Sequence, residues 1–123
     1  MEKKLAVLLE DDESVLKLFV AFLEMSGYEV IAATNPEDAV GKIETNEIYL
    51  LVSDLGVHCG HIKDGCEEKI IASLQRLFKI KNIKKVVLTS GDHMILKNVV
   101  SAIKIASGFC KTDGMEAFMS LVR

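Results

Sequence analysis

The chain has 123 residues, half of them hydrophobic and 27% charged, a balance typical of one compact domain and not of a disordered tail. A formal net charge of -3, with Lys and Arg scattered along the chain, argues against direct nucleic-acid binding. No apolar stretch approaches the length of a membrane span, and the first apolar run meets four acidic residues without a signal-peptide cleavage site. We therefore expect residues 1–123 to form a single domain of a cytoplasmic protein, with no membrane contact.

Five short apolar runs have the composition of buried strands. The first, at residues 5–9, is an unbroken hydrophobic run, as expected for a parallel strand covered on both faces. In chain order, the expected strands cover residues 5–9, 28–33, 48–52, 86–88 and 109–110.

Segments with helical spacing of apolar residues follow each expected strand. The first helix should stop at Gly27, and Asn35-Pro36 supplies a cap and a first-turn proline for the second. The remaining helices are expected at about 70–78, 93–107 and 115–122. Strictly alternating strands and helices predict an α/β fold, a doubly wound five-stranded parallel sheet with five helices on both faces.

Polar residues stand where the expected strands end. Glu10-Asp11, Asp54, Thr89 and Lys111 follow four different strands, and the carboxyl ends of parallel strands meet at one edge of a sheet. Three neighbouring carboxylates repel one another unless a cation intervenes, and Mg²⁺ suits a site with few protein ligands. One carboxylate can then act as a nucleophile, while the ammonium and the hydroxyl stabilise incoming oxygens. This set of groups points to phosphoryl transfer.

The motifs LLEDDE, SDLG, VVLTSGD and GFCKT together resemble the receiver domains of bacterial two-component response regulators, over essentially the whole chain. The resemblance implies the flavodoxin-like, CheY-like form of the doubly wound sheet. Asp54 follows Asp11 by 43 positions and Lys111 follows Thr89 by 22, as in typical receivers. The distance from Asp11 to Gly27 assigns the acidic pair of the family to Glu10-Asp11.

The resemblance implies a role for each of these residues. Asp54 would accept a phosphoryl group from a phosphohistidine, and the acyl phosphate would later hydrolyse. Asp11, Asp54 and the backbone carbonyl of Gly56 would bind Mg²⁺ directly, with Glu10 acting through water. Thr89 would bond a phosphoryl oxygen, and Lys111 would bridge Asp54 and then the phosphate.

The resemblance also implies a signalling domain, not an enzyme, with Mg²⁺-dependent self-phosphorylation and autodephosphorylation. Its phosphodonor would be a histidine kinase or a histidine phosphotransfer protein. Its output would be a downstream target protein or a homodimer, formed through the face between the fourth and fifth helices. The fourth helix favours this surface, because it has more apolar residues than one buried stripe needs.

The sequence departs from the family pattern at several positions. Thr112 stands where a proline usually follows the lysine, and Gly108 occupies the position of the usual aromatic switch residue. Phe109 lies one residue later, so on a strand it should point to the other face and be a buried core aromatic. Gly56 and Gly91 leave the two positions that flank the site without side chains. The missing proline, the displaced aromatic and a longer segment after Asp54 favour one alternative, a receiver-like interaction module that works without phosphorylation.

The segment after Asp54 is longer than usual and raises a metal hypothesis. His58, Cys59, His61 and Cys66 could ligate zinc, but their spacing matches no common zinc signature, and a plain surface loop is the preferred interpretation. Cys59, Cys66 and Cys110 are odd in number, and without a sign of export no disulfide framework is expected. Cys110 is expected to be a small buried hydrophobe.

Other phosphate chemistries fit less well. An aspartyl phosphatase needs a second carboxylate two residues after its nucleophile, where this chain has Gly56. Gly60 and Gly65 have P-loop spacing, but Cys66-Glu67 follows in place of the phosphate-binding lysine and hydroxyl. A dinucleotide fold is excluded because no glycine fingerprint follows the first strand.

Overall fold

The computed structural model describes residues 3–59 and 66–123. Gly60, His61 and Gly65, considered above as parts of a ligand-binding loop, lie outside this range. The strands are β1 (Lys4–Leu9), β2 (Tyr28–Ala33), β3 (Leu50–Asp54), β4 (Lys85–Ser90) and β5 (Ala106–Cys110). The helices are α1 (Glu13–Met25), α2 (Pro36–Glu44), the short 3-10 helix η1 (Gly56–His58), α3 (Cys66–Ile80), α4 (His93–Ala102) and α5 (Met115–Val122).

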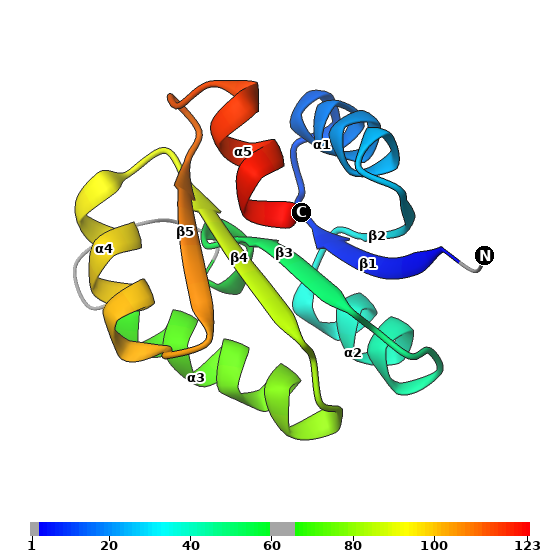
Figure 1. Cartoon of the computed structure of the whole chain (residues 1–123). Coiled ribbons are helices and arrows are strands. Elements are labelled where there is room, and N and C mark those ends of the chain that lie inside the picture. The colour runs from blue at the N-terminus through cyan, green and yellow to red at the C-terminus, as the bar shows by residue number, and fades with distance from the viewer. Residues whose placement is uncertain (1–2, 60–65) are drawn as a thin grey trace.

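All five strands are parallel and lie in the order β2-β1-β3-β4-β5. Helices α1 and α5 cover one face of the sheet, and α2, α3 and α4 cover the other (Figure 1). The predicted doubly wound α/β sheet is therefore confirmed. The chain reverses direction across the sheet between β1 and β3, which is where such folds open a crevice at the carboxyl ends of the strands.

The core divides into two layers because strand side chains alternate between faces. In β1, Ala6 and Leu8 pack with residues of α1 and α5, and Val7 and Leu9 pack with residues of α2, α3 and α4. All four are fully buried. The unbroken apolar run at the start of the sequence is thus explained by a strand that has no solvent-facing side.

Three helices begin at side-chain caps that the strand ends supply. Asp12 accepts a hydrogen bond from the Val15 amide at 3.1 Å, Asn35 caps α2, and Asp92 caps α4. These caps satisfy amides that a helix cannot pair internally. Because Asp12 is occupied as the cap of α1, Glu10 and Asp11 are the acidic residues left for the edge of the sheet.

The boundary between α4 and β5 differs from the sequence prediction. The helix ends at Ala102, not at 107, and β5 begins at Ala106, not at 109. Residues 106–110 pair with Val86–Ser90, so their backbone groups belong to the sheet ladder. A short apolar run does not by itself distinguish a helix from a strand, and here the open edge of β4 decides. Gly108 lets α4 lie close, since a Cβ there would be 3.0 Å from Val100 Cγ2.

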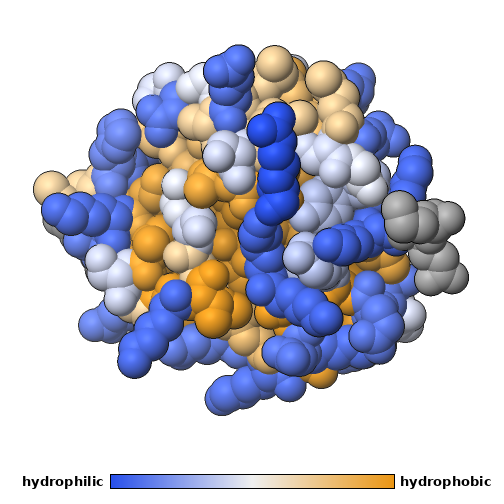
Figure 2. Space-filling model, viewed as in Figure 1, coloured by the Kyte–Doolittle hydropathy of each residue, from blue (hydrophilic) through white to orange (hydrophobic). Residues whose placement is uncertain are grey.

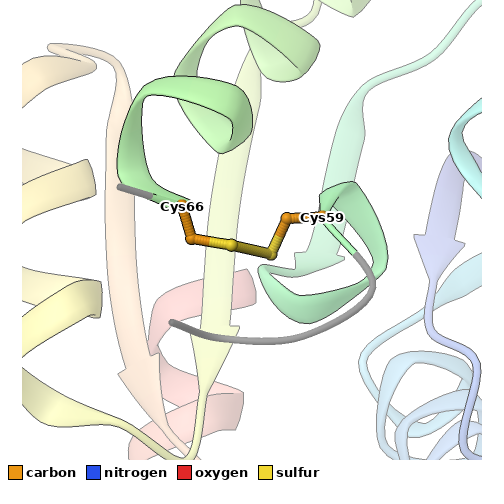
Figure 3. Close-up of a disulfide and its surroundings, with 2 residues drawn as sticks. All are labelled: Cys59 and Cys66. Atoms are coloured by element: carbon orange, nitrogen blue, oxygen red, sulfur yellow. A yellow bond between two sulfur atoms is a disulfide. The ribbon is translucent and has the colours of Figure 1, made fainter. Parts of the chain in front are cut away.

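A disulfide joins Cys59, just after η1, to Cys66, the first residue of α3 (Figure 3). The expectation that the chain has no disulfide is therefore wrong. The sequence shows only the odd cysteine count, whereas folding brings the two Cα atoms to 6.3 Å, within the range that a disulfide spans. Cys110 is buried, as predicted.

Two glycines give a paired test of backbone conformation. Gly41 lies inside α2 with open space where a Cβ would be, and Gly27 has a φ of 91°. We expect Gly41→Ala to raise the free energy of unfolding by about 0.5–1 kcal/mol, because alanine is the better helix former. Gly27→Ala should lower it by about 1–2 kcal/mol, because an L-residue is strained at that φ. Urea unfolding of both variants tests this, and shifts of the same sign would contradict the assignment.

Candidate functional site

Strand register places the predicted site residues side by side. Leu9 is opposite Ser53, so the residues that follow them, Glu10 and Asp54, are neighbours across β1 and β3. Asp54 is in turn opposite Thr89 in β4. The carboxyl ends of three central strands therefore meet at these side chains, as the sequence predicted.

A carboxylate cluster occupies this edge. One oxygen from each of Glu10, Asp11 and Asp54 lies within 4.8 Å of the others. Glu10 is buried and its Oε2 accepts hydrogen bonds from the amides of Asp11 and Asp12, at 3.0 and 3.2 Å. Asp54 is also buried, whereas Asp11 is exposed to solvent. The cluster thus has a rigid buried side and an open side.

Lys111 reaches this cluster from the end of β5. Its Nζ lies 2.7 Å from Asp54 Oδ1 and 2.9 Å from Glu10 Oε1. The Lys111 amide donates to the Ser90 carbonyl at 2.9 Å, so the ladder between β4 and β5 continues up to the lysine and fixes its backbone. Thr112, which stands in place of the usual proline, does not keep the ammonium from the cluster.

Burial and pairing shift the pKa values of Glu10 and Lys111. Burial raises the pKa of the Glu10 carboxyl, the hydrogen bond from Lys111 offsets part of that rise, and the charge of Asp54 adds to it. Burial alone would lower the pKa of Lys111, but the hydrogen bonds to Asp54 and Glu10 outweigh it, so this pKa is raised. The lysine therefore stays charged at neutral pH.

The net negative charge of the site would be balanced by a divalent cation. Three carboxylates and one ammonium leave two negative charges in a small region, when all four groups are ionised. Oxygen ligands and this charge fit Mg²⁺ or another hard divalent ion. Among residues 3–59 and 66–123, this is the one group of His, Cys, Asp and Glu side chains that could hold a metal.

The hydroxyl of Thr89 is buried and, within the described part of the chain, has no hydrogen-bond partner. A buried hydroxyl without a partner is costly, by about 1–3 kcal/mol. Such a group is suited to bond an oxygen that arrives with a ligand. Because Thr89 is opposite Asp54 in the sheet, its hydroxyl is placed to bond an oxygen of a group bound at that aspartate.

Gly56 keeps one side of Asp54 open. A Cβ at this position would lie 3.1 Å from Asp54 Oδ2, so any side chain there would crowd that oxygen. At Gly91 a Cβ would meet no atom within 4 Å. The two glycines flank the site in the sequence, but the structure gives a steric role to Gly56 alone.

His58 is a site-neighbouring residue whose role the sequence did not reveal. Its Nε2 lies 2.7 Å from Ser53 Oγ, and its Nδ1 lies 2.7 Å from Ser73 Oγ in α3. Burial lowers the pKa of His58 from 6.5 to about 4, so the imidazole is neutral and donates through one nitrogen while it accepts through the other. The spacing of Ser73 to the buried Ile70 and Leu77, three and four residues away, was the available signal that it faces inward.

The zinc hypothesis for the same segment is not supported by the described residues. Cys59 and Cys66 are bonded to each other, and both nitrogens of His58 face serine hydroxyls. His58 is also partly buried, so the expectation of a plain surface loop was incomplete. His61 lies outside the described residues.

Phe109 is a core residue, as predicted. It is buried and contacts the rings of Phe19 and Phe118 edge-on, with centroids 6.2 and 5.2 Å away. Gly108, at the position usual for the switch aromatic, lies under Leu96 and Val100 of α4.

Comparisons with known proteins agree with this arrangement. No protein-family model matches the sequence. A stretch of 55 residues is 44% identical to the alkaline phosphatase synthesis transcriptional regulatory protein PhoP of Bacillus subtilis (strain 168). It covers 45% of this chain and 22% of that protein, so the match spans less than a quarter of the relative.

Solved structures match over nearly the whole chain. The CheY-like receiver domain protein of Methanospirillum hungatei JF-1 has a TM-score of 0.77 at 20% identity, covering 98% of this chain and 91% of that one. A response regulator from Thermotoga maritima has a TM-score of 0.77 at 19% identity, covering 98% and 95%. A response regulator from Burkholderia pseudomallei, solved with a phosphorylated aspartic acid and a calcium ion, has a TM-score of 0.75 at 15% identity, covering 98% and 66%.

The fold is therefore that of the response-regulator receiver domains. The partial sequence match to PhoP points to the same class, so fold and sequence together support a two-component receiver. Within the described residues, no helix has both the length and the apolar character needed to cross a membrane.

The burial of His58 predicts a loss of stability in acid. The unfolded chain binds a proton at His58 near pH 6.5 and the folded chain only near pH 4, so this residue makes the free energy of unfolding fall as the pH drops from 6.5 to 4. The effect should reach about 3 kcal/mol near pH 4 and vanish above pH 7.

Urea unfolding of the wild type and His58→Gln across this pH range tests the prediction. The raised pKa of Glu10 is common to both proteins, so the difference between them isolates the histidine. A difference that stays constant from pH 4 to pH 7 would contradict a buried neutral imidazole.

Proposed function

We propose that residues 1–123 form one receiver domain that accepts a phosphoryl group on Asp54 in a Mg²⁺-dependent reaction and thereby signals to a partner. The observation that carries this proposal is the position of Asp54, between a carboxylate cluster, the ammonium of Lys111 and the unpartnered hydroxyl of Thr89. Each of these groups answers a separate need of phosphoryl transfer, and all lie at one edge of the sheet.

Asp11, Asp54 and the backbone carbonyl of Gly56 would hold the metal, with Glu10 acting through water. Bound Mg²⁺ would neutralise charge on the carboxylates and on phosphoryl oxygens. Asp11 is exposed and can exchange water for ligand oxygens, whereas Glu10 is fixed by two backbone amides. The proposed division between direct and water-mediated contact follows this difference.

In the proposed reaction, a carboxylate oxygen of Asp54 attacks the phosphorus of a phosphohistidine. The P–N bond breaks as the P–O bond forms, and the histidine leaves with the electron pair and takes up a proton from the solvent. Lys111 stabilises the oxygens that carry the developing charge, and Thr89 donates its hydroxyl hydrogen to one of them. Water later hydrolyses the acyl phosphate and restores the carboxylate, so the domain is a resettable switch and not an enzyme that acts on a separate substrate.

The same contacts give the two states different energies. Without phosphate, Lys111 is bound to Asp54 and Glu10, and the hydroxyl of Thr89 has no partner in the described residues. A phosphoryl group on Asp54 offers both of them new oxygens. A ligand shifts a conformational equilibrium only by such a difference in contacts.

The first test is incubation with acetyl phosphate and Mg²⁺, followed by intact-mass analysis of the wild type and Asp54→Asn. We expect a phosphoryl adduct on the wild type that needs Mg²⁺ and is absent from the variant, because the amide cannot accept the group. Folded wild-type protein that forms no adduct, with a histidine phosphotransfer donor as well as with acetyl phosphate, would rule out the proposal.

The absence of an adduct with either donor would support an interaction module that works without phosphorylation. One feature of the structure favours this alternative: Gly108 offers no side chain to move, and Phe109 is held among core rings. We therefore do not expect this chain to signal by moving an aromatic side chain at β5.

Gly56 and Gly91 provide a matched pair for the lifetime of the phosphoryl group. We expect Gly56→Val to slow dephosphorylation roughly tenfold, about 1.4 kcal/mol of barrier, because its side chain would crowd Asp54 Oδ2 and obstruct water. Gly91→Val should change the half-life much less. Adduct decay followed by mass spectrometry measures both, and equal half-lives in all three proteins would contradict this role of Gly56.

For partners, the proposal names a histidine kinase or histidine phosphotransfer protein as donor, in the cytoplasm. The output surface is assigned to the face between α4 and α5, used by a target protein or a second copy. Figure 2 shows hydrophobic side chains gathered over the region of β5, with hydrophilic residues around them. Ile105, just before β5 in the sequence, is 54% exposed. Leu96 and Val99 of α4, and Ile103 directly after it, are buried and belong to the core.

A further inference from the structure

The disulfide lies in the segment that carries the phosphoacceptor. Asp54 ends β3, η1 begins at Gly56, and Cys59 follows directly after η1. Its partner Cys66 is the first residue of α3 (Figure 3). The covalent bond therefore ties the loop proposed to supply a metal ligand to a helix that packs on the sheet.

We propose that Cys59 and Cys66 form a reversible redox site, and that its oxidation state sets the affinity of the neighbouring carboxylate cluster for Mg²⁺. The redox part stands on the disulfide alone. The coupling part rests on the proposed function.

The positions of the two sulfur-bearing residues suit thiol–disulfide exchange. Cys59 is partly exposed and Cys66 is 2% exposed, so an external thiolate reaches Cys59 more readily. A dithiol reductant attacks the Cys59 sulfur, the S–S bond breaks, and Cys66 leaves as a thiolate that takes up a proton. The second thiol of the reductant then resolves the mixed disulfide, so two electrons and two protons pass to the protein and the reductant becomes a disulfide.

A reducing compartment would hold this pair as thiols, and an oxidising episode would close it. The bond closes a small ring, since the two cysteines are seven positions apart in the sequence. A short ring constrains mainly the chain beside it and the denatured state only modestly. Its effect is therefore local to η1, where Gly56 lies.

A second attachment limits how far η1 can move. His58 links Ser53 of β3 to Ser73 of α3 and is independent of the sulfur atoms. Reduction should thus loosen the loop without releasing it. The cluster would keep its fixed side at Glu10 and Lys111 but lose preorganisation at the carbonyl of Gly56, which lowers metal affinity.

The redox part is tested by equilibrating the folded wild-type protein in reduced and oxidised dithiothreitol at graded ratios, trapping thiols by alkylation and weighing the intact protein. We expect two thiols to appear together as one two-electron couple, while buried Cys110 stays unmodified. Cys110→Ser should give the same titration. A pair that becomes reducible only when the protein unfolds, or that never oxidises, would overturn the proposal.

The coupling part is tested by Mg²⁺ titration calorimetry of the oxidised and reduced wild type. Oxidised protein should bind at least about fivefold more tightly, and by reciprocity saturating Mg²⁺ should lower the midpoint potential of the pair by about 20 mV. The double variant Cys59→Ala/Cys66→Ala should bind like reduced protein whether or not oxidant is present. Equal Mg²⁺ affinities in both redox states would overturn the coupling.

Failure of the proposed function gives a different pattern. Asp54 would then form no adduct in either redox state, while the dithiol titration would be unchanged. Phosphorylation of Asp54 with no redox dependence of Mg²⁺ binding would instead leave the receiver function standing and remove the redox control.

Discussion

The bonding of one ammonium to two buried carboxylates holds the functional edge of this molecule together. Glu10 is 1% exposed, and a carboxylate so far from water is tolerated only if it is paired and hydrogen-bonded. Lys111 provides the pairing and two backbone amides provide the hydrogen bonds. Because the same Nζ also contacts Asp54, the ends of β1, β3 and β5 are joined by one charge. Any change in the charge on Asp54 must therefore alter contacts at the other two strands.

The register of the parallel strands sets the relative positions of the residues at this edge. Parallel pairing sets Asp54 opposite Thr89 and sets the residue before Glu10 opposite the residue before Asp54. The helices add little chemistry here, but their caps remove competing groups, as when Asp12 is taken up by the amide of Val15. Acidic residues only one or two positions apart in the sequence therefore have different contacts: Asp12 caps α1, and Glu10 pairs with Lys111.

The sequence predicted the strands, the sheet and the edge residues well, because buried parallel strands are unbroken apolar runs and their ends carry the polar side chains. It failed where the answer depended on contacts between distant segments. Residues 103–107 are apolar enough for a helix, yet the open edge of β4 draws 106–110 into a strand. The pairing of Cys59 with Cys66 and the link from His58 to Ser73 likewise depend on how η1 meets α3, which periodicity does not encode.

Two of these misses, the disulfide and the link from His58 to Ser73, lie on the Gly56 side of Asp54. On its Lys111 side, Asp54 is held by an ion pair, and the backbone of Lys111 is held by a ladder hydrogen bond to Ser90. On its Gly56 side it is followed by a segment that a histidine and a disulfide attach to α3, and whose spacing departs from the family pattern. We expect the phosphoryl-transfer chemistry that receivers share to depend on the Lys111 side. We expect properties that vary from one receiver to another, such as metal affinity and phosphoryl lifetime, to depend on the Gly56 side. The unusual residues of this chain, His58 and the bonded pair Cys59 and Cys66, lie on the Gly56 side, where the proposed redox control also lies.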